Sequence, residues 1–496
     1  MRGIYTASIW SMYSSPVVWC AFGAALAYYG LAGLFAAGCP PVLILFLLLP
    51  AALPALCKVR GRRRFYALAC AVFYAGGIIF GAAARRGADT AALVFPGQSV
   101  EKVNAVTGIL LDDPRSSRSG QGLASLALEY TYGGGKGGIT VRASARGSLL
   151  VLFPEEALPH LKDFGRGSRI TIDGKFLPPQ KAGQKMLYKA KSVHILRAPG
   201  KVNRLRTSIR LSLLDFFGEK WGGLSMALLL GIRDNLDSNL AAQYTKAGCA
   251  YILALSGMHL AIISAAIAFL LKKPLGLKGA AAAGAVIIVL YVYIVGAQAS
   301  LCRAAIMYLL GAAAVIFALP ATPLLLLAFS FLIQLAIAPA SGDSISFILS
   351  YLALAGILIW TEHIVCIFRG LVPEFLLSPL AVSISAFLAT MPVCILFFGE
   401  LRMAGIAAGL AMVPLTAFFM LGSMMYLVLG LIPLLKTFAS FVLGSLYFIL
   451  DRLSFFAAKA PPLALPPAPL TLFFSIAVPL LFLAAGIYAA KKRAVV

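Results

Sequence analysis

A serine and a histidine stand three residues apart, as Ser256 and His259, in an otherwise apolar run. At this spacing on a helix the two side chains share one face. Gly257 lies between them and permits either a close helix approach or a break in the helix. A histidine inside an apolar span is costly unless it faces protein or water. The pair therefore indicates either a hydrogen bond that packs helices together or a polar group that lines a passage or handles protons.

Other charged residues lie before and after this pair in the sequence. Arg303 lies a few residues inside a later apolar run, where it can either snorkel to the outer headgroups or face a phosphate. Arg233, Asp234 and Asp237 form a polar turn before the pair. This turn either pairs internally or acts as a gate, and the sequence leaves both alternatives open.

The usual signatures of catalysis are missing from the sequence. We find no Walker A loop, no nucleophile elbow with a Ser-His-Asp set and no two-histidine zinc helix. The chain has only four histidines, at positions 160, 194, 259 and 363, which cannot form a zinc cluster. We therefore expect no catalytic residue, no metal and no cofactor. If the chain moves a substrate across the membrane, the energy must come from the proton gradient, a cytoplasmic motor or pulling by bound proteins.

The composition places these residues in a membrane. Hydrophobic residues make up 61% of the chain and charged residues 12%, whereas soluble domains are about half apolar and about a quarter charged. Apolar runs long enough to cross a bilayer as helices recur along the chain, and we expect about twelve spans. The net charge of +24 fits cytoplasmic loops rich in Lys and Arg, and also a nucleic-acid partner.

The order of the runs predicts an α-helical polytopic membrane protein with an inserted domain. Three spans are expected within 1–85, and a basic knot at 58–64 places the loop between the second and third in the cytoplasm. Both termini are then cytoplasmic, and the polar segment after the third span lies outside. Nine further spans are expected at 251–271, 279–297, 302–319, 322–340, 345–367, 375–398, 403–430, 437–457 and 470–490.

Residues 86–202 have the character of a small β domain. Five or six short alternating runs, separated by turns rich in Gly and Ser, predict an extracytoplasmic OB-like β-barrel. Residues 203–248 are then an interfacial amphipathic helix followed by the polar turn.

From 100 to 206 there are 18 Lys and Arg against 8 Asp and Glu. A basic face suits a phosphate backbone, and anionic lipid headgroups are an equal alternative. The predicted residues of this basic face are Lys175, Lys181, Lys185, Lys189, Lys191 and Arg197.

Three phrases in the second half of the chain resemble, in order and spacing, those of the ComEC competence channel family. They are AGCAYILALSGMH at 247–259, AQASLCRAAIM at 297–307 and FILSYLA at 347–353. The resemblance implies that 249–496 is a transmembrane channel domain for transforming DNA. It also adds Tyr251, Ser300 and Ser350 to Ser256, His259 and Arg303 as residues that line the path. At positions 251, 299, 348 and 409 this chain carries Tyr, Ala, Ile and Gly where the family phrases carry His, Pro, Gln and Asn.

The function that the resemblance implies is uptake of single-stranded DNA across the bacterial inner membrane during natural transformation. Many family members carry a C-terminal metallo-β-lactamase-like domain, which this sequence does not show. The expected partners are therefore single-stranded DNA, membrane lipids, a separate nuclease, a DNA receptor and a cytoplasmic motor or DNA-binding protein. Two other classes stay open: a transporter or membrane enzyme for a lipid-linked or small solute, and a non-conducting scaffold that keeps only the fold.

Overall fold

The computed structural model places most of the chain from residue 103 to residue 465. It describes 103–111, 115–116, 121–134, 140–145, 147–154, 167–177, 187–198, 220–233, 236–296, 298–429 and 432–465, with a few single residues between and after these ranges. The three predicted spans within 1–85, the basic knot at 58–64 and most of the predicted span 470–490 lie outside the described residues.

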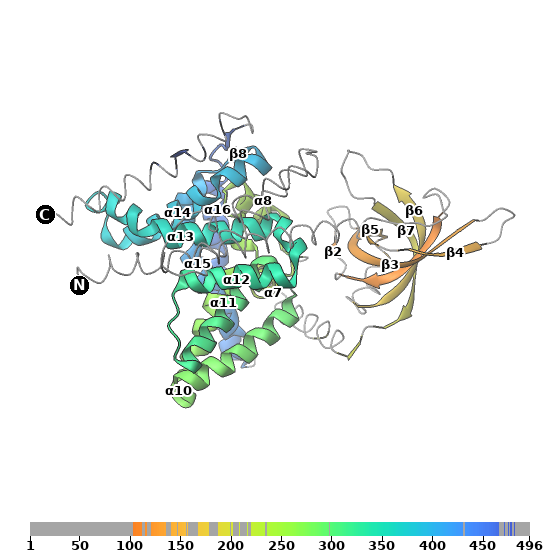
Figure 1. Cartoon of the computed structure of the whole chain (residues 1–496), viewed down its shortest axis with the longest axis horizontal. Coiled ribbons are helices and arrows are strands. Elements are labelled where there is room, and N and C mark those ends of the chain that lie inside the picture. The colour runs from red at the N-terminus through yellow and green to blue at the C-terminus, as the bar shows by residue number, and fades with distance from the viewer. Residues whose placement is uncertain are drawn as a thin grey trace, which may run out of the picture. The chain divides into compact units, whose positions relative to one another are not determined.

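The chain divides into two compact units. One unit is Ala84–Gly218, and the other combines Met1–Ala83 with Glu219–Val496. The described part of the first unit is built from strands, and that of the second is almost entirely helical (Figure 1).

The first unit is a closed five-strand barrel. Strand β1 pairs with β6, β6 with β7, β7 with β5 and β5 with β3, and β3 returns to β1. All of these pairs are antiparallel except β5 with β7. Two further strands, β2 and β4, pair with β3. The predicted small barrel is thereby confirmed, while its OB-like form stays a prediction. The strand bounds are β1 Val103–Leu110, β2 Arg115–Ser116, β3 Gly122–Gly134, β4 Thr140–Ser144, β5 Ser148–Phe153, β6 Arg169–Leu177 and β7 Leu187–Arg197.

Alternating side chains fill the inside of the barrel. In β5 every second residue is buried, because successive side chains of a strand point to opposite faces. The fully buried Tyr188 ends in a hydroxyl that donates to the carbonyl of Asn104 at 3.0 Å. Burial, helped by the negative charge of Asp173, raises the pKa of this phenol, so the hydroxyl stays protonated and keeps donating.

The second unit is a set of apolar helices with three short connecting elements. Among the described residues, six helices are long and apolar enough to cross a membrane: α10, α11, α13, α14, α15 and α16. The chain is therefore a membrane protein, and the total of about twelve spans stays a prediction. The bounds are α7 Lys220–Leu230, α8 Ser238–Lys246, α9 Ala250–Leu253, α10 Gly257–Val295, α11 Ala299–Phe317, α12 Pro323–Ile337, η4 Pro339–Asp343, α13 Ile345–Phe368, α14 Glu374–Phe398, β8 Glu400–Leu401, α15 Ala404–Leu429, α16 Pro433–Ala457 and β9 Leu463–Ala464.

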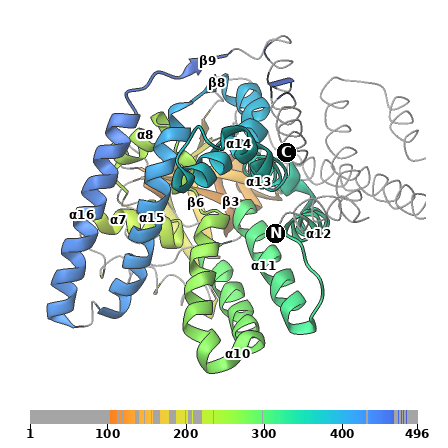
Figure 2. The same cartoon turned by 90° about the vertical axis from the view of Figure 1, so that its left-hand side faces the viewer.

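Helix α10 is a hairpin of two arms. It has 39 residues, about 58 Å at 1.5 Å per residue, whereas the apolar core of a bilayer is about 30 Å thick. The helix breaks at Gly276, whose φ of 68° suits a residue without a side chain, and the chain reverses there (Figure 2). Lys272, Lys273 and Lys278 are exposed around this turn. The second arm corresponds to the predicted span 279–297, whereas the first begins at Gly257, later than the predicted span 251–271.

Candidate functional site

A short non-helical segment separates α9 from α10. Ala254 and Ser256 are both in the extended region of backbone space, so the carbonyls before α10 lose their helical partners. Side chains from other segments replace those partners. Arg233 Nη2 donates to the carbonyl of Leu253 at 2.8 Å, and Ser300 Oγ donates to that of Leu255 at 2.5 Å. Broken helices at membrane depth require such compensation, because lipid supplies no donors.

Ser256 and His259 form the N-terminal cap of α10. The backbone N–H of Ser256 donates to His259 Nδ1 at 3.2 Å, and Ser256 Oγ lies 3.1 Å from the same nitrogen. Since a backbone N–H can only donate, Nδ1 is the acceptor and the neutral ring carries its proton on Nε2. The ring is fully buried, and Nε2 has no partner within the described chain. The bonds of Nδ1 therefore stabilise the start of its own helix.

Arg303 projects from the first turns of α11 into the helix packing. Its side chain is 7% exposed, and Nη1 donates to the carbonyl of Ser350 on α13. Nη2 lies against Gly257, where an added Cβ would come within 2.7 Å of it. The guanidinium carbon is also 5.9 Å from the ring centroid of Tyr351. Arg303 thus joins the start of α10 to α13.

A second group of buried polar side chains adjoins Arg303, and the sequence analysis missed it. Tyr351 donates its hydroxyl to Gln334 Oε1 at 3.0 Å, and Gln334 Nε2 donates to the carbonyl of Ala299 at 3.0 Å. Ser330 Oγ lies 3.3 Å from the Tyr351 hydroxyl. Gln334 is 5% exposed. A lone amide in the apolar run 323–337 is the signal that could have identified this group.

Tyr251 occupies the exposed side of the same region. It lies on α9 and is 50% exposed. Its hydroxyl approaches α15, where an added Cβ at Gly409 would come within 2.7 Å of it. These are two of the four positions at which the chain differs from the family phrases, and the absence of a side chain at one makes room for the tyrosine at the other.

The predicted polar turn is only partly described. Asp237 caps the N-terminus of α8 and accepts from the backbone N–H of Asn239 at 2.8 Å. Arg233 braces the broken segment as given above, and Asp234 lies outside the described residues. The contacts at the helix break bring together the predicted path residues 256, 259, 300, 303 and 350, through their side chains or their backbone. Arg233 joins them from a separate segment.

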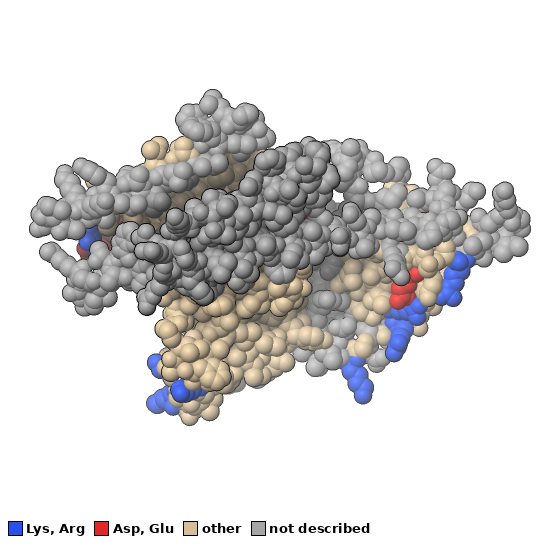
Figure 3. Space-filling model, viewed as in Figure 1, with Lys and Arg blue, Asp and Glu red and all other residues tan. Residues whose placement is uncertain are grey.

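We call the basic residues of β6 and β7 the basic face of the β domain. Lys175 and Lys189 are directly opposite cross-strand partners, and both are exposed, as are Lys191 and Arg197. Like charges directly opposite each other repel, so an anion bound between them would relieve the repulsion. Figure 3 shows Lys and Arg gathered along one edge of this domain. Lys181 and Lys185 lie outside the described residues.

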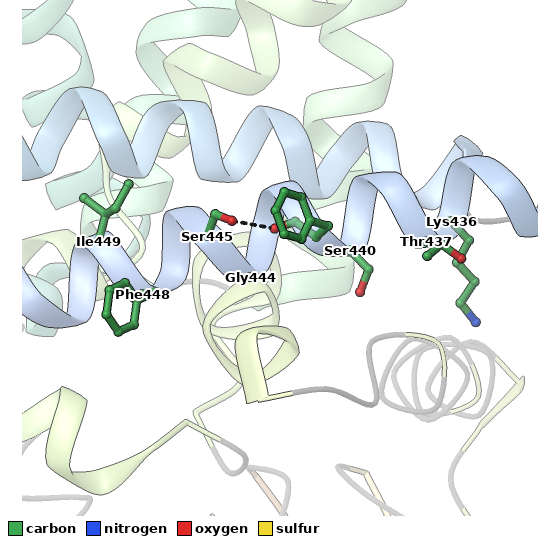
Figure 4. A pocket seen from close by; sticks show the side chains of 8 residues that line it. Lys436, Thr437, Ser440, Gly444, Ser445, Phe448 and Ile449 are labelled. Carbon is green, nitrogen blue, oxygen red and sulfur yellow. Dashed lines mark hydrogen bonds between the residues drawn. The ribbon is translucent and has the colours of Figure 1, made fainter.

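A groove lies elsewhere, along one helix. It follows α16 and is lined by Lys436, Thr437, Ser440, Phe441, Gly444, Ser445, Phe448 and Ile449 (Figure 4). None of the residues at the helix break lines it. Within the described residues, no group of three His, Cys, Asp or Glu side chains could hold a metal ion.

These features define a class of protein: a membrane protein of apolar helices with buried polar side chains at a helix break, combined with a small basic β-barrel. Residues 228–490, more than half of the chain, match the model of the Competence protein family. The chain belongs to this family. The match includes α8 to α16 and the whole helix break. No curated protein matches the chain.

Proposed function

We propose that this protein is an inner-membrane channel that takes single-stranded DNA into the cytoplasm during natural transformation. The observation that carries the proposal is the buried polar cluster at the helix break, formed by Ser256, His259, Ser300 and Arg303. Membership of the Competence protein family supports a role in DNA uptake.

The charge on the strand needs polar partners inside the membrane. A phosphate chain cannot cross hydrocarbon without polar partners, because an unpaired charge there is very costly. The cluster supplies hydroxyl, imidazole and guanidinium groups in the middle of apolar sequence. It also sits where a helix is already broken, and such breaks occur in membrane proteins only where they line a cavity or are buried in protein.

The β domain has a matching role in the proposal. Its basic face would hold the sugar-phosphate backbone, as basic grooves of single-strand binding domains do. Its closed five-strand barrel is consistent with an OB-like domain that receives the strand before the membrane.

We further propose an orientation. The exposed lysines at the turn of α10 fit a cytoplasmic loop under the positive-inside rule. With that turn inside, the residues before α10 face outward, the β domain is extracytoplasmic and both termini are cytoplasmic. In this proposal the chain supplies the passage only, and a separate nuclease, a DNA receptor and a cytoplasmic motor or the proton gradient supply the other steps.

The test traps a strand in transit. A photo-crosslinking amino acid, p-benzoylphenylalanine, replaces Tyr251, which is half-exposed beside the cluster, or Val286, which is 61% exposed on the second arm of α10. Transforming DNA that ends in biotin-streptavidin stalls during uptake. We expect strand crosslinks from position 251 and none from position 286. Equal labelling at both positions would contradict a path at the cluster, and normal transformation of a strain that lacks this chain would refute the function itself.

A further inference from the structure

The polar cluster holds more hydrogen-bond donors than acceptors. Its carbonyls accept from Arg233, Ser300 and Arg303. Two buried nitrogens have no partner among the described residues, His259 Nε2 and Arg303 Nε. Nε of an arginine can only donate, and His259 Nε2 also donates because Nδ1 is already an acceptor. What the cluster lacks is therefore an acceptor.

The surrounding charge has the same sign. Helices α10 and α11 begin at this cluster, at Gly257 and Ala299, and the N-terminus of a helix carries a partial positive charge. The guanidinium of Arg303 lies against the first of these residues. Within the described chain no carboxylate forms an ion pair with Arg303. A buried cation without a counter-ion is unfavourable, so the site favours an anion.

We propose that His259, Arg303 and the start of α10 bind one phosphodiester group of the passing strand. This proposal rests on the proposed function and adds the chemistry of one contact. At neutral pH a phosphodiester carries one negative charge and offers only acceptors, which complements two N–H donors. A planar guanidinium suits phosphate oxygens in particular, because its donors form a fixed fork.

The first test uses the unaltered full chain in lipid nanodiscs. Labelling with ¹⁵N-histidine gives signals from only four residues, and the His259 signal is assigned by its loss in His259→Gln. The probe is dimethyl phosphate, a phosphodiester with one charge and no base. We expect the neutral Nε2–H form of His259 and a shift of Nε2 that saturates with a Kd on the order of 1 mM, the strength of two charge-assisted hydrogen bonds. His363, half-buried on α13 with Nδ1 beside the carbonyl of Ile359, is the internal control.

A matched pair of variants tests the part played by the guanidinium. Arg303→Gln should weaken dimethyl phosphate binding at His259 about tenfold or more, whereas Arg303→Lys should retain part of it through its charge. Arg452→Gln removes the same charge from an exposed position over Phe448, and it should leave the shift unchanged. A proton on His259 Nδ1, or no response of Nε2 to dimethyl phosphate in the unaltered chain, would overturn the site. An equal loss in Arg303→Gln and Arg452→Gln would do so too.

Transformation separates this proposal from the function on which it rests. A strain that lacks the chain is complemented with Arg303→Gln, and DNA uptake is measured at matched protein levels. We expect uptake to fall at least tenfold. If His259 ignores dimethyl phosphate but uptake still needs the chain, the phosphate site is wrong and the channel stands. If the strain takes up DNA without the chain, the proposed function fails whatever the spectrum shows.

Discussion

Replacing Ser300 with alanine should measure how strongly the helix break depends on a single hydroxyl. Ser300 is 8% exposed and donates to the carbonyl of Leu255, which has lost its helical partner. The variant leaves that carbonyl buried and unpaired, which costs about 1–3 kcal/mol in proteins generally. Hydrogen bonds between membrane helices average about 0.6 kcal/mol and reach about 1.7 kcal/mol. We expect about 1–2 kcal/mol for Ser300→Ala, because the acceptor belongs to a broken backbone segment.

The assay is thermal unfolding of the full chain in detergent, with Ser445→Ala as the matched control. Ser445 also donates from a membrane helix to a backbone carbonyl, that of Phe441, at 2.9 Å. That bond is exposed and lies within one helix, so its loss should change stability by less than about 0.5 kcal/mol. At roughly 2–4 °C per kcal/mol, Ser300→Ala should lower the midpoint by about 2–8 °C, and the control should lower it by less than about 2 °C.

Two results would refute the reasoning. Equal midpoints for the two variants would mean that the carbonyl of Leu255 finds another partner and that Ser300 does not hold the break. A lower midpoint for the control would mean that the loss of a hydroxyl destabilises any helix of this unit, regardless of what it bonds to.

Further substitutions test the geometry around the break and on the β domain. Gly257→Ala should displace the guanidinium of Arg303, and should therefore lower DNA uptake in a transformation assay at normal protein levels. Gly405→Ala places a Cβ 2.8 Å from the carbonyl oxygen of Gly248, so its unfolding midpoint should fall by several degrees. Gly200→Ala, with open space around the new Cβ, should not shift this midpoint. Replacing Lys175 and Lys189 with glutamine should reduce the salt slope of single-strand binding by about 1.4, since each phosphate contact contributes about 0.7.

The sequence was sufficient to predict the elements whose pattern is local. Long apolar runs define membrane helices through composition alone, and α13, for example, begins at residue 345 and ends at 368 where 345–367 was expected. The reversal within α10 was predicted between the spans 251–271 and 279–297, where Lys272, Lys273 and Lys278 interrupt the apolar run. The barrel was predicted from alternation and turn residues, which act over a few positions.

The contacts that build the site depend on distant pairs, and the sequence does not reveal these. Nothing in the local pattern joins Tyr351 to Gln334 or Arg233 to the carbonyl of Leu253, because each pair is set by how separate segments pack. Register across strands is also a tertiary property. The basic residues of the β domain were visible, but the direct opposition of Lys175 and Lys189 follows from the pairing of β6 with β7.

The balance of donors and acceptors at the helix break supports the proposed phosphate contact. If the polar side chains served packing alone, each buried donor would meet an acceptor, since unpaired polar groups are unfavourable in a core. Here the carbonyls of Leu253, Leu255 and Ser350 each accept from a side chain, while His259 and Arg303 each retain a donor without a partner. A site with paired acceptors and unpaired donors favours an anion, as the proposed phosphate contact requires. In the function that we propose for this member of the Competence protein family, that anion is a phosphate of the DNA strand.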